Sequence, residues 1–362
     1  MAGAPTLLET TSRILALPRE AGTAAVEEAR RIVADHLTHL GYQVQFQRFR
    51  FTPASLDAFP IFGAGLGGLA LIILPSLSSG EVPRWLGLLM WAVGLAALTI
   101  LAIGVGLGWV PLQRGTREDA NLLATRPGSH PRRWIVAHLD SKAQGHSMAG
   151  RLVAVWVVAG AILILGVLAS LRFLQGPLRP LWLMLGMAPA LLAGVLAGRG
   201  RLRGTSIGAR DNASGVVAAL VAAERSQDVG TGILITSAEE FGLVGGRVFA
   251  RLTPNVQDME FINLDTLDQE GTLYVVSHDA KGHRFGRELE SRLSALDLPI
   301  QHRRLPWGIF VDSAAFARAH ARSVTLGRLT WATLRRIHTP DDTAQDLSLS
   351  TAEQIGRAIV SN

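Results

Sequence analysis

Four stretches of the chain contain no charged residue and are long enough to cross a bilayer as helices. They are Ala58–Gly80, Trp85–Gln113, Leu152–Leu171 and Pro180–Gly198. Each reaches the roughly 18 to 20 apolar residues that span a hydrocarbon core, and short connections join them in pairs. The pattern predicts two transmembrane hairpins, in which glycines allow close packing of helices. Those glycines are Gly63, Gly65, Gly67 and Gly68. The alternative is four buried core helices, although core helices usually show amphipathic periodicity.

The remaining segments have the periodicities of a soluble α/β protein. Residues 23–40 carry the apolar stripe of an amphipathic helix, and residues 42–51 alternate apolar and polar positions like a strand. Further strands are predicted at 120–125, 133–140, 232–238, 259–266, 272–278 and 323–328, and further helices at 215–225, 244–252, 283–295, 312–319 and 350–360. Strands that alternate with helices favour a mostly parallel mixed sheet sandwiched by helices.

The predicted organisation is therefore one α/β domain interrupted by two insertions. Its three parts are residues 1–57, 114–151 and 199–362. The two transmembrane hairpins, 58–113 and 152–198, separate these parts.

The net charge is +6, and the placement of the basic residues predicts an orientation in the membrane. Basic residues flank the apolar stretches on the side of the polar segments: Arg48, Arg50, Arg114, Arg117, Lys142, Arg151, Arg199, Arg201 and Arg203. The two hairpin connections hold only Arg84, Arg172 and Arg179. The positive-inside rule then places both termini and the polar domain in the cytoplasm, as in a multi-pass protein of a bacterial inner membrane.

The placement of charge and the absence of cysteine narrow the kinds of partner and of metal site that the chain can have. The basic residues cluster at membrane boundaries without interleaved aromatic residues, which argues against a nucleic-acid partner. The chain has no cysteine, so disulfide bonds and thiolate zinc sites are excluded.

Five short contexts carry acidic residues and histidines in an order that can hold two divalent metals. They are "VAHLDS" with His138 and Asp140, "GARDNASGV" with Asp211, "TSAEEFG" with Glu239 and Glu240, "INLDTL" with Asp265, and "IHTPDDT" with His338. Singly, His138, Asp265 and His338 are more often structural, and Asp211 could equally be a helix N-cap. In combination they predict a co-catalytic metal centre.

The positions of these residues suggest their roles. His138 and Asp140 lie two apart at a strand end, so Asp140 is expected to hydrogen-bond the ring nitrogen of His138 that faces away from the metal. Asp211 opens a tight turn before a helix, where a carboxylate can bridge two cations ~3.5–4 Å apart. Asp341 and Asp342 follow His338 as candidate hydrogen-bond partners of its ring.

Glu239 and Glu240 follow a buried strand and should point in different directions. One can bind a metal while the other reaches the attacking water, and Glu239 is the natural general base on a metal-bridging water or hydroxide. With Asp265 the set comprises one bridging carboxylate, two further carboxylates and two imidazoles. This oxygen and nitrogen set suits two Zn²⁺ ions, with Mn²⁺ or Co²⁺ possible. Two divalent cations, three ligand carboxylates and one hydroxide also balance to zero charge.

These contexts resemble the dizinc aminopeptidase family that includes aminopeptidase Y, glutamate carboxypeptidase and the transferrin-receptor ectodomain. The resemblance implies the zinc-exopeptidase fold and assigns each residue a role. It implies that His138 and Asp265 hold one zinc, Glu240 and His338 the other, that Asp211 bridges them, that Glu239 is the base, and that Asp140 orients His138. The segment Val311–Phe316 is similar to an Asp-containing segment that precedes a late helix in the family.

The leading interpretation is a membrane-anchored dizinc aminopeptidase that hydrolyses N-terminal peptide bonds of peptides at the membrane surface. The same fold could instead support a carboxypeptidase, a dipeptidase or a glutaminyl cyclase, or a catalytically inactive binding scaffold. Trp307, Phe310 and Trp331 flank the last motifs, where they either line an apolar pocket or, in the more ordinary case, pack in the core.

Overall fold

The computed structural model describes residues 5–106, 109–110, 115–305 and 309–361. The chain divides into two compact units. Unit 1 comprises Met1–Phe51, Thr116–Ala143 and Gly204–Asn362, and unit 2 comprises Thr52–Gly115 and Gln144–Arg203. Unit 1 is therefore assembled from three separate segments of the chain.

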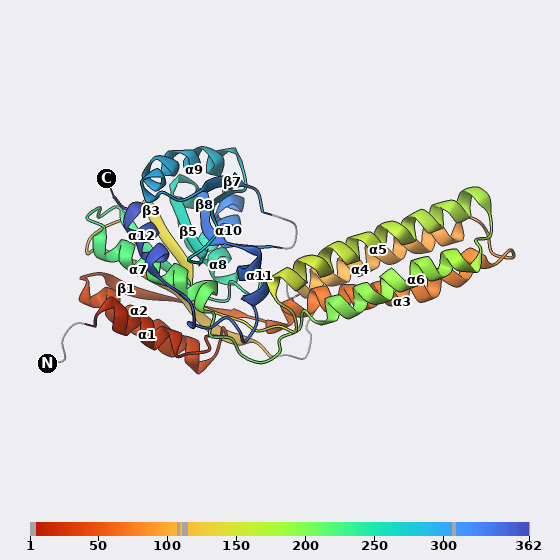
Figure 1. Cartoon of the computed structure of the whole chain (residues 1–362), viewed down its shortest axis with the longest axis horizontal. Helices are drawn as coiled ribbons and strands as arrows, with labels where there is room; N and C mark the ends of the chain where they lie inside the picture. The colour runs from red at the N-terminus through yellow and green to blue at the C-terminus, as the bar shows by residue number, and fades with distance from the viewer. Residues whose placement is uncertain (1–4, 107–108, 111–114, 306–308, 362) are drawn as a thin grey trace. The chain divides into compact units, whose positions relative to one another are not determined.

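Unit 1 is built on an eight-stranded mixed sheet with strand order β1-β2-β4-β3-β5-β8-β6-β7 (Figure 1). The strands are β1 Gln43–Phe51, β2 Arg117–Thr125, β3 Arg133–His138, β4 Thr231–Thr236, β5 Glu260–Leu267, β6 Thr272–Ser277, β7 Ile300–Arg303 and β8 Arg322–Leu329. The central strands are parallel: β3 pairs with β4 and β5, and β5 pairs with β8. Antiparallel pairs occur at β1–β2, β2–β4 and β6–β8. The mixed α/β sheet expected from the sequence is confirmed.

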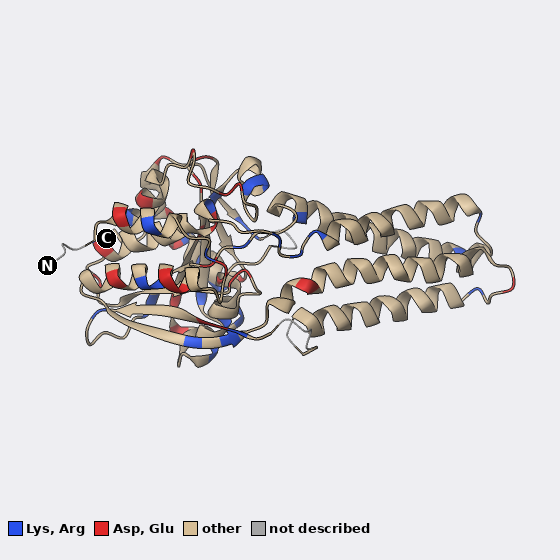
Figure 2. Cartoon of the chain, turned by 90° about the horizontal axis from the view of Figure 1, so that it is seen from below, with Lys and Arg blue, Asp and Glu red and all other residues tan. Residues whose placement is uncertain are grey.

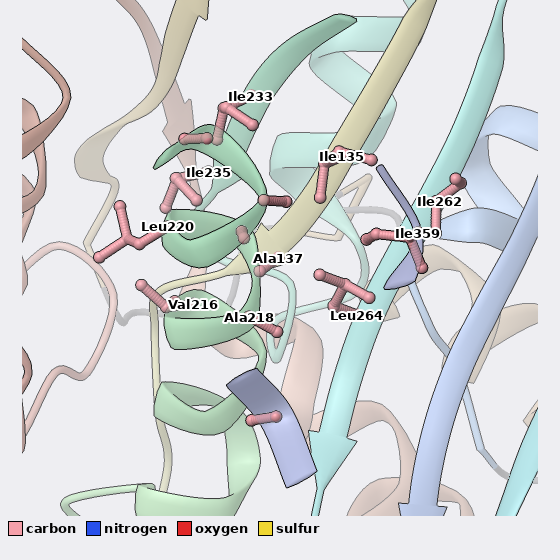
Figure 3. Packing of buried hydrophobic residues seen from close by; sticks show 14 of the residues in the cluster. Ile135, Ala137, Val216, Ala218, Leu220, Ile233, Ile235, Ile262, Leu264 and Ile359 are labelled. Atoms are coloured by element: carbon pink, nitrogen blue, oxygen red, sulfur yellow. The ribbon is translucent and has the colours of Figure 1, made fainter. Parts of the chain in front are cut away.

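Successive residues of a strand point to opposite sides of the sheet, so buried strands place apolar side chains on both faces. Helices cover both faces. One face shares a core with α1 Leu7–Leu15, α2 Ala24–His39, α7 Ser214–Arg225, α9 Ala280–Leu293 and α12 Ser350–Ala358. Figure 3 shows Val216, Ala218 and Leu220 of α7 packed against strand residues such as Ile135 and Ile235. The other face packs against α8 Val244–Leu252 and α10 Ser313–Arg318 through an aromatic cluster. That cluster contains Trp134, Phe249, Phe261 and Phe316.

The local signals in the sequence explain where these helices begin. The hydroxyl of Thr23 caps α2, accepting from the N–H of Val26 at 3.4 Å, and the predicted stripe of that helix is buried. The predicted strand at 42–51 is confirmed as β1. Short elements without a clear period were not predicted: β7, with four residues, and α11 Trp331–Arg336.

Unit 2 contains four helices that are long and apolar enough to cross a membrane. They are α3 Ala58–Ser78, α4 Leu86–Gly106, α5 Met148–Gln175 and α6 Pro180–Gly198. Charged residues are scarce along these helices, as Figure 2 shows. Helix α5 begins before the predicted charge-free stretch and includes Arg151 and Arg172. Residues 107–108 and 111–114, in and next to the predicted stretch that ends at Gln113, lie outside the described residues.

Glycines let two pairs of these helices approach closely. A Cβ atom at Gly63 would lie 2.3 Å from the Cβ of Ala197 in α6, and one at Gly65 would lie 2.2 Å from a methyl carbon of Leu98 in α4. The predicted role in close packing therefore holds at Gly63 and Gly65. A Cβ at Gly68 would contact nothing within 4 Å, so that glycine does not serve helix packing.

Candidate metal centre

Three neighbouring parallel strands end at the edge of the sheet where the candidate residues meet. His138 is the last residue of β3, Asp265 lies near the end of β5, and Glu239 follows the end of β4 by three residues. Carboxyl ends of parallel strands lie on the same edge, which is where open α/β sheets build their sites. Residues from three strands are therefore brought to one place by the topology alone.

Asp211 lies between the two histidines. Its Oδ1 atom is 3.1 Å from Nε2 of His138, and its Oδ2 atom is 3.1 Å from Nε2 of His338. Each carboxylate oxygen thus faces a different imidazole. This is the geometry that a carboxylate needs to bridge two cations.

The five predicted ligands form two groups that share Asp211. The first group is His138, Asp211 and Asp265, and the second is Asp211, Glu240 and His338. Asp265 Oδ1 lies 3.8 Å from His138 Nε2, and Glu240 Oε1 lies 3.3 Å from His338 Nε2. The ligand atoms of each group lie within 4.8 Å of one another, and all five residues are buried.

The turn Ala209–Ala213 that carries Asp211 is held by side chains from other elements. Asp342 accepts hydrogen bonds from the N–H of Arg210 at 2.9 Å and of Asp211 at 3.1 Å. Burial raises the pKa of Asp342 to about 6. The sequence suggested Asp342 as a partner of His338, whereas it binds the main chain of this turn instead. The Nδ1 atom of His338 has no hydrogen-bond partner among the described residues.

A glycine precedes this turn for a steric reason. Gly208 has φ of +61°, and a Cβ atom there would lie 2.3 Å from the carbonyl oxygen of Asp211. Any larger residue would collide with the backbone that positions Asp211. The peptide bond between Asp211 and Asn212 is cis.

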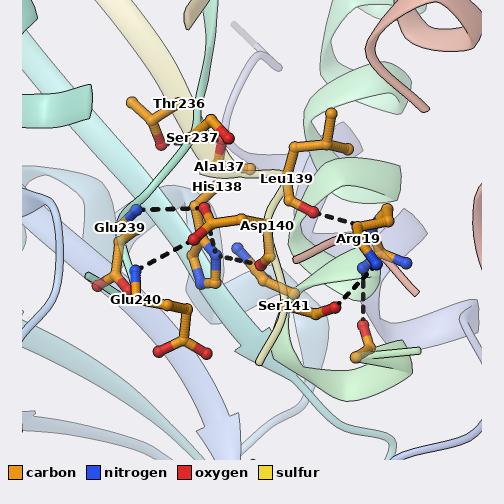
Figure 4. Close-up of polar contacts among 12 residues, drawn as sticks. Arg19, Ala137, His138, Leu139, Asp140, Ser141, Thr236, Ser237, Glu239 and Glu240 are labelled. Carbon is orange, nitrogen blue, oxygen red and sulfur yellow. Dashed lines mark hydrogen bonds and ion pairs between the residues drawn. The ribbon is translucent and has the colours of Figure 1, made fainter. Parts of the chain in front are cut away.

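Asp140 lies beside the ring of His138, as expected, but the hydrogen bond to that ring is made by its main-chain carbonyl. The Nδ1 atom of His138 lies 3.0 Å from the main-chain carbonyl oxygen of Asp140, but 3.7 Å from its carboxylate. The two carboxylate oxygens accept from the N–H groups of Glu239 and Glu240, both at 3.2 Å (Figure 4). The carbonyl therefore contacts the histidine ring, and the carboxylate positions the two glutamates.

Burial and neighbouring charges shift the pKa values of Glu239 and Glu240 in opposite directions. Burial raises the pKa of Glu239 well above its usual range, although His138 opposes this shift. Burial also favours the neutral form of Glu240, but His338 and Lys142 outweigh it and lower the pKa of Glu240 to about 2. Adjacent carboxyl groups with opposite shifts are typical of a ligand next to a general base.

Burial and neighbouring charges also shift the pKa values of His138 and Asp211, in opposite directions. Burial by itself would lower the pKa of His138, but Glu239, Asp140, Asp211 and Asp265 raise that pKa well above its usual value. Burial would raise the pKa of Asp211, yet the two histidines lower it. Asp211 is thus ionised at the centre of the group.

Two buried cations at this site were not predicted from the sequence. Arg19 is completely buried and donates to the carbonyl oxygens of Leu139 at 2.8 Å and Gly208 at 3.0 Å, which ties the loop after β3 to the Asp211 turn. Figure 4 shows this contact with Leu139. Lys142 lies with its Nζ atom 2.5 Å from Oε2 of Glu240. No local pattern marks either residue, because their partners come from distant parts of the chain.

The residues present fit divalent metals. The carboxyl groups of Asp211, Glu239, Glu240 and Asp265 converge in a buried space, where uncompensated negative charge is costly. The Oε1 atom of Glu240 is buried without a hydrogen-bond partner among the described residues. Carboxylate and imidazole ligands of this kind suit zinc. The two groups can therefore hold one ion each, with Asp211 shared.

Two of the three aromatic residues near the last motifs, Phe310 and Trp331, are exposed. Phe310 is 54% exposed and Trp331 is 56% exposed, so the expectation that they pack in the core is wrong. Trp307 lies outside the described residues. A cavity of about 750 Å³ is lined by α2 and β1 residues such as Glu27 and Arg48, and it does not include the metal-binding groups.

Comparisons with known proteins agree with this geometry. Residues 186–362 match the family described as peptidase family M28. That segment contains Asp211, Glu239, Glu240, Asp265 and His338, whereas His138 and Asp140 precede it. A search of curated protein sequences found no match to this chain.

Several solved structures share the fold at low sequence identity. A zinc aminopeptidase from Bacillus subtilis is 15% identical with a TM-score of 0.56, covering 99% of this chain and 95% of its own. An aminopeptidase from Aneurinibacillus is 13% identical with a TM-score of 0.54, covering 98% and 93%. A glutaminyl cyclase from Porphyromonas gingivalis is 12% identical with a TM-score of 0.56, covering 99% and 98%. At these identities the structures establish the fold of the chain.

Proposed function

This chain carries a peptidase family M28 domain over residues 186–362, and from that premise we propose that it is a membrane-anchored dizinc aminopeptidase. The resemblance to zinc aminopeptidases that the five motifs predicted is confirmed by the family match. The M28 match and the aminopeptidase neighbours support a peptidase. The number of ions, the aminopeptidase reaction and the anchoring are parts of the proposal.

The observation that carries the proposal is the position of Asp211 between His138 and His338, with 3.1 Å on each side. His138 and Asp265 would hold one zinc, and Glu240 and His338 the other. Two zinc ions, when bound, would lower the pKa of a water molecule and polarise the carbonyl of the scissile bond. Asp211 would be shared by both ions.

Glu239 would be the general base. Its main chain is fixed by Asp140, and burial raises the pKa of its carboxyl group, which makes its carboxylate a stronger proton acceptor. It would accept a proton from the attacking water as the carbon–oxygen bond forms. It would then deliver that proton to the amine that leaves as the carbon–nitrogen bond breaks.

Glutaminyl cyclisation is the second candidate reaction, because a glutaminyl cyclase shares the fold. The retention of the complete ligand set together with Glu239 favours hydrolysis. A panel of aminoacyl-anilides and N-terminal glutaminyl peptides separates the two. Release of the anilide amine supports the aminopeptidase, whereas cyclisation of glutaminyl peptides without hydrolysis supports the cyclase.

The membrane part of the proposal is supported by the sheet itself. Its strands come from all three segments of unit 1: β1 from the first, β2 and β3 from the second, and β4 to β8 from the third. One sheet cannot be divided by a bilayer, so each insertion must return the chain to the side it left. Two helices in each insertion meet this requirement.

The surface of unit 2 also suits lipid. Leu66 and Ile73 are buried in its interior, while Ile72, Trp156 and Met184 are more than half exposed. Apolar side chains both inside and outside are expected in a bilayer, whereas a water-soluble bundle exposes polar faces. With the positive-inside rule, we propose four spanning helices with unit 1 and both termini in the cytoplasm. The location of the peptide substrates at the membrane surface stays a prediction.

The test uses the full-length protein in detergent. We expect about two zinc ions per chain, loss of aminoacyl-anilide hydrolysis on chelation, and recovery on adding zinc. Glu239→Gln should lower kcat by roughly 10²- to 10⁴-fold and keep the zinc. Glu118→Gln is the control, because Glu118 is exposed and pairs with Arg50. A protein that binds no zinc, or a fully active Glu239→Gln variant, would refute the proposal.

A further inference from the structure

Lys142 is a buried lysine beside one of the two groups of metal-binding residues. Its side chain is 2% exposed, and its Nζ atom lies 2.5 Å from Oε2 of Glu240. The chain has 35 basic residues, of which only Lys142 and Lys281 are lysines. A compact ammonium group, rather than the broad guanidinium used almost everywhere else in the chain, therefore stands at this position.

The two oxygens of Glu240 face different cations. Oε1 points to the ligand group, 3.3 Å from Nε2 of His338, while Oε2 contacts Lys142. The main-chain N–H of Glu240 is bound by Asp140. Lys142 thus fixes the orientation of this carboxylate and leaves one of its oxygens for a metal.

The two groups differ in the partner of the carboxylate that each does not share. Both share Asp211, and each adds one carboxylate and one histidine. The Oδ1 atom of Asp265 accepts from the neutral hydroxyl of Thr266 at 3.0 Å, whereas Glu240 is paired with the ammonium of Lys142. Buried charges are poorly screened, so a fixed positive charge next to a ligand opposes the binding of a second cation there.

We propose that Lys142 is a positioning residue that makes the two metal sites unequal. It holds Glu240 as a ligand through one oxygen and weakens the site of Asp211, Glu240 and His338 for its ion. The site of His138, Asp211 and Asp265 then holds its ion tightly, while the other ion exchanges. This inference rests on the proposed function, because it requires that two metals bind.

The test is a calorimetric titration of chelator-treated full-length protein with Zn²⁺ alone. The wild type should show one tight and one weak class of site, separated by at least tenfold in Kd. Lys142→Met and Lys142→Gln should both tighten the weak class at least tenfold and leave the tight class unchanged. Tighter binding is not expected of a variant that is merely disrupted. Lys281→Met is the matched control, because Lys281 is exposed and donates to the carbonyl of His320.

A second measurement does not depend on whether the Lys142 variants fold. In the wild-type lysine background, Asp265→Asn should remove the tight class, and Glu240→Gln should remove the weak class. Two classes of equal affinity, the reverse assignment, or folded Lys142 variants with unchanged or weaker binding would overturn the inference alone. Absence of zinc binding in the wild type would instead refute the proposed function.

Discussion

The carboxylate of Asp140 accepts a hydrogen bond from the main-chain N–H of Glu239, at 3.2 Å. Its second oxygen accepts from the next N–H along the chain, that of Glu240, so one side chain fixes the backbone of both glutamates. An asparagine at 140 offers one acceptor oxygen instead of two, and one buried N–H would lose its partner.

We therefore expect Asp140→Asn to lower kcat by roughly ten- to a hundredfold, which corresponds to the ~1–3 kcal/mol cost of an unsatisfied buried group. Zinc content should stay close to wild type, because Asp140 is not among the ligands. Asp279→Asn is the control: Asp279 caps α9 through the N–H of Gly282, and asparagine caps equally well. Wild-type activity in Asp140→Asn would show that this anchor has no role.

Asp211 is the one residue common to both metal-binding groups. Removing its charge should therefore weaken both sites, whereas Asp265→Asn should affect only the site of His138. After rapid gel filtration out of saturating zinc, we expect less than about one zinc per chain in Asp211→Asn and about one in Asp265→Asn, against about two in the wild type. Metal analysis of the purified variants measures this. Equal zinc content in the two variants would contradict a bridging role.

The sequence predicts which candidate residues come together, because each follows a recognisable local signal. His138 and Asp265 end or follow strands with long apolar runs, and Asp211 lies in a turn before a helix. Parallel strands bring such ends to one edge of the sheet. The topology therefore converts five separate local patterns into one cluster.

The partners of those residues are harder to predict. Asp140 was expected to bind the ring of His138, but its carboxylate binds N–H groups that are about a hundred residues away along the chain. Lys142 and Arg19 are single charges in ordinary local sequence, and only tertiary packing gives them buried partners. The rarity of lysine in an arginine-rich chain is the one signal that could have pointed to Lys142.

Asp312 gives the folded protein a dependence on pH. It is completely buried, and its Oδ2 atom accepts from the hydroxyl of Thr236 at 2.5 Å. Its Oδ1 atom has no hydrogen-bond partner among the described residues. Burial raises the pKa of Asp312 from 3.8 to about 7. A carboxyl group with a raised folded-state pKa binds protons more strongly in the folded state, so stability falls as pH rises from about 4 to about 7.

The loss approaches the order of 4 kcal/mol above the folded-state pKa, at 1.36 kcal/mol for each pKa unit. Asp312→Asn has no charge to bury, so its unfolding temperature relative to wild type should be higher at pH 8 than at pH 5. Thermal unfolding of metal-free protein, followed by tryptophan fluorescence, measures the difference. The same difference at both pH values would show that Asp312 does not titrate in this range.

The absence of cysteine makes the proposed topology directly measurable by labelling. A single cysteine at Glu81 would lie in the first hairpin connection, and one at Gln175 would lie at the end of α5 next to the second. Cysteines at Asp258 and Gln301 would lie in unit 1, and all four positions are exposed. Because both hairpins should cross the bilayer and return, a maleimide that cannot cross membranes should label 81 and 175 in cells with a permeable outer membrane. It should label 258 and 301 only after lysis. The reverse pattern would place unit 1 outside the cytoplasm, and labelling of all four sites in intact cells would contradict spanning helices.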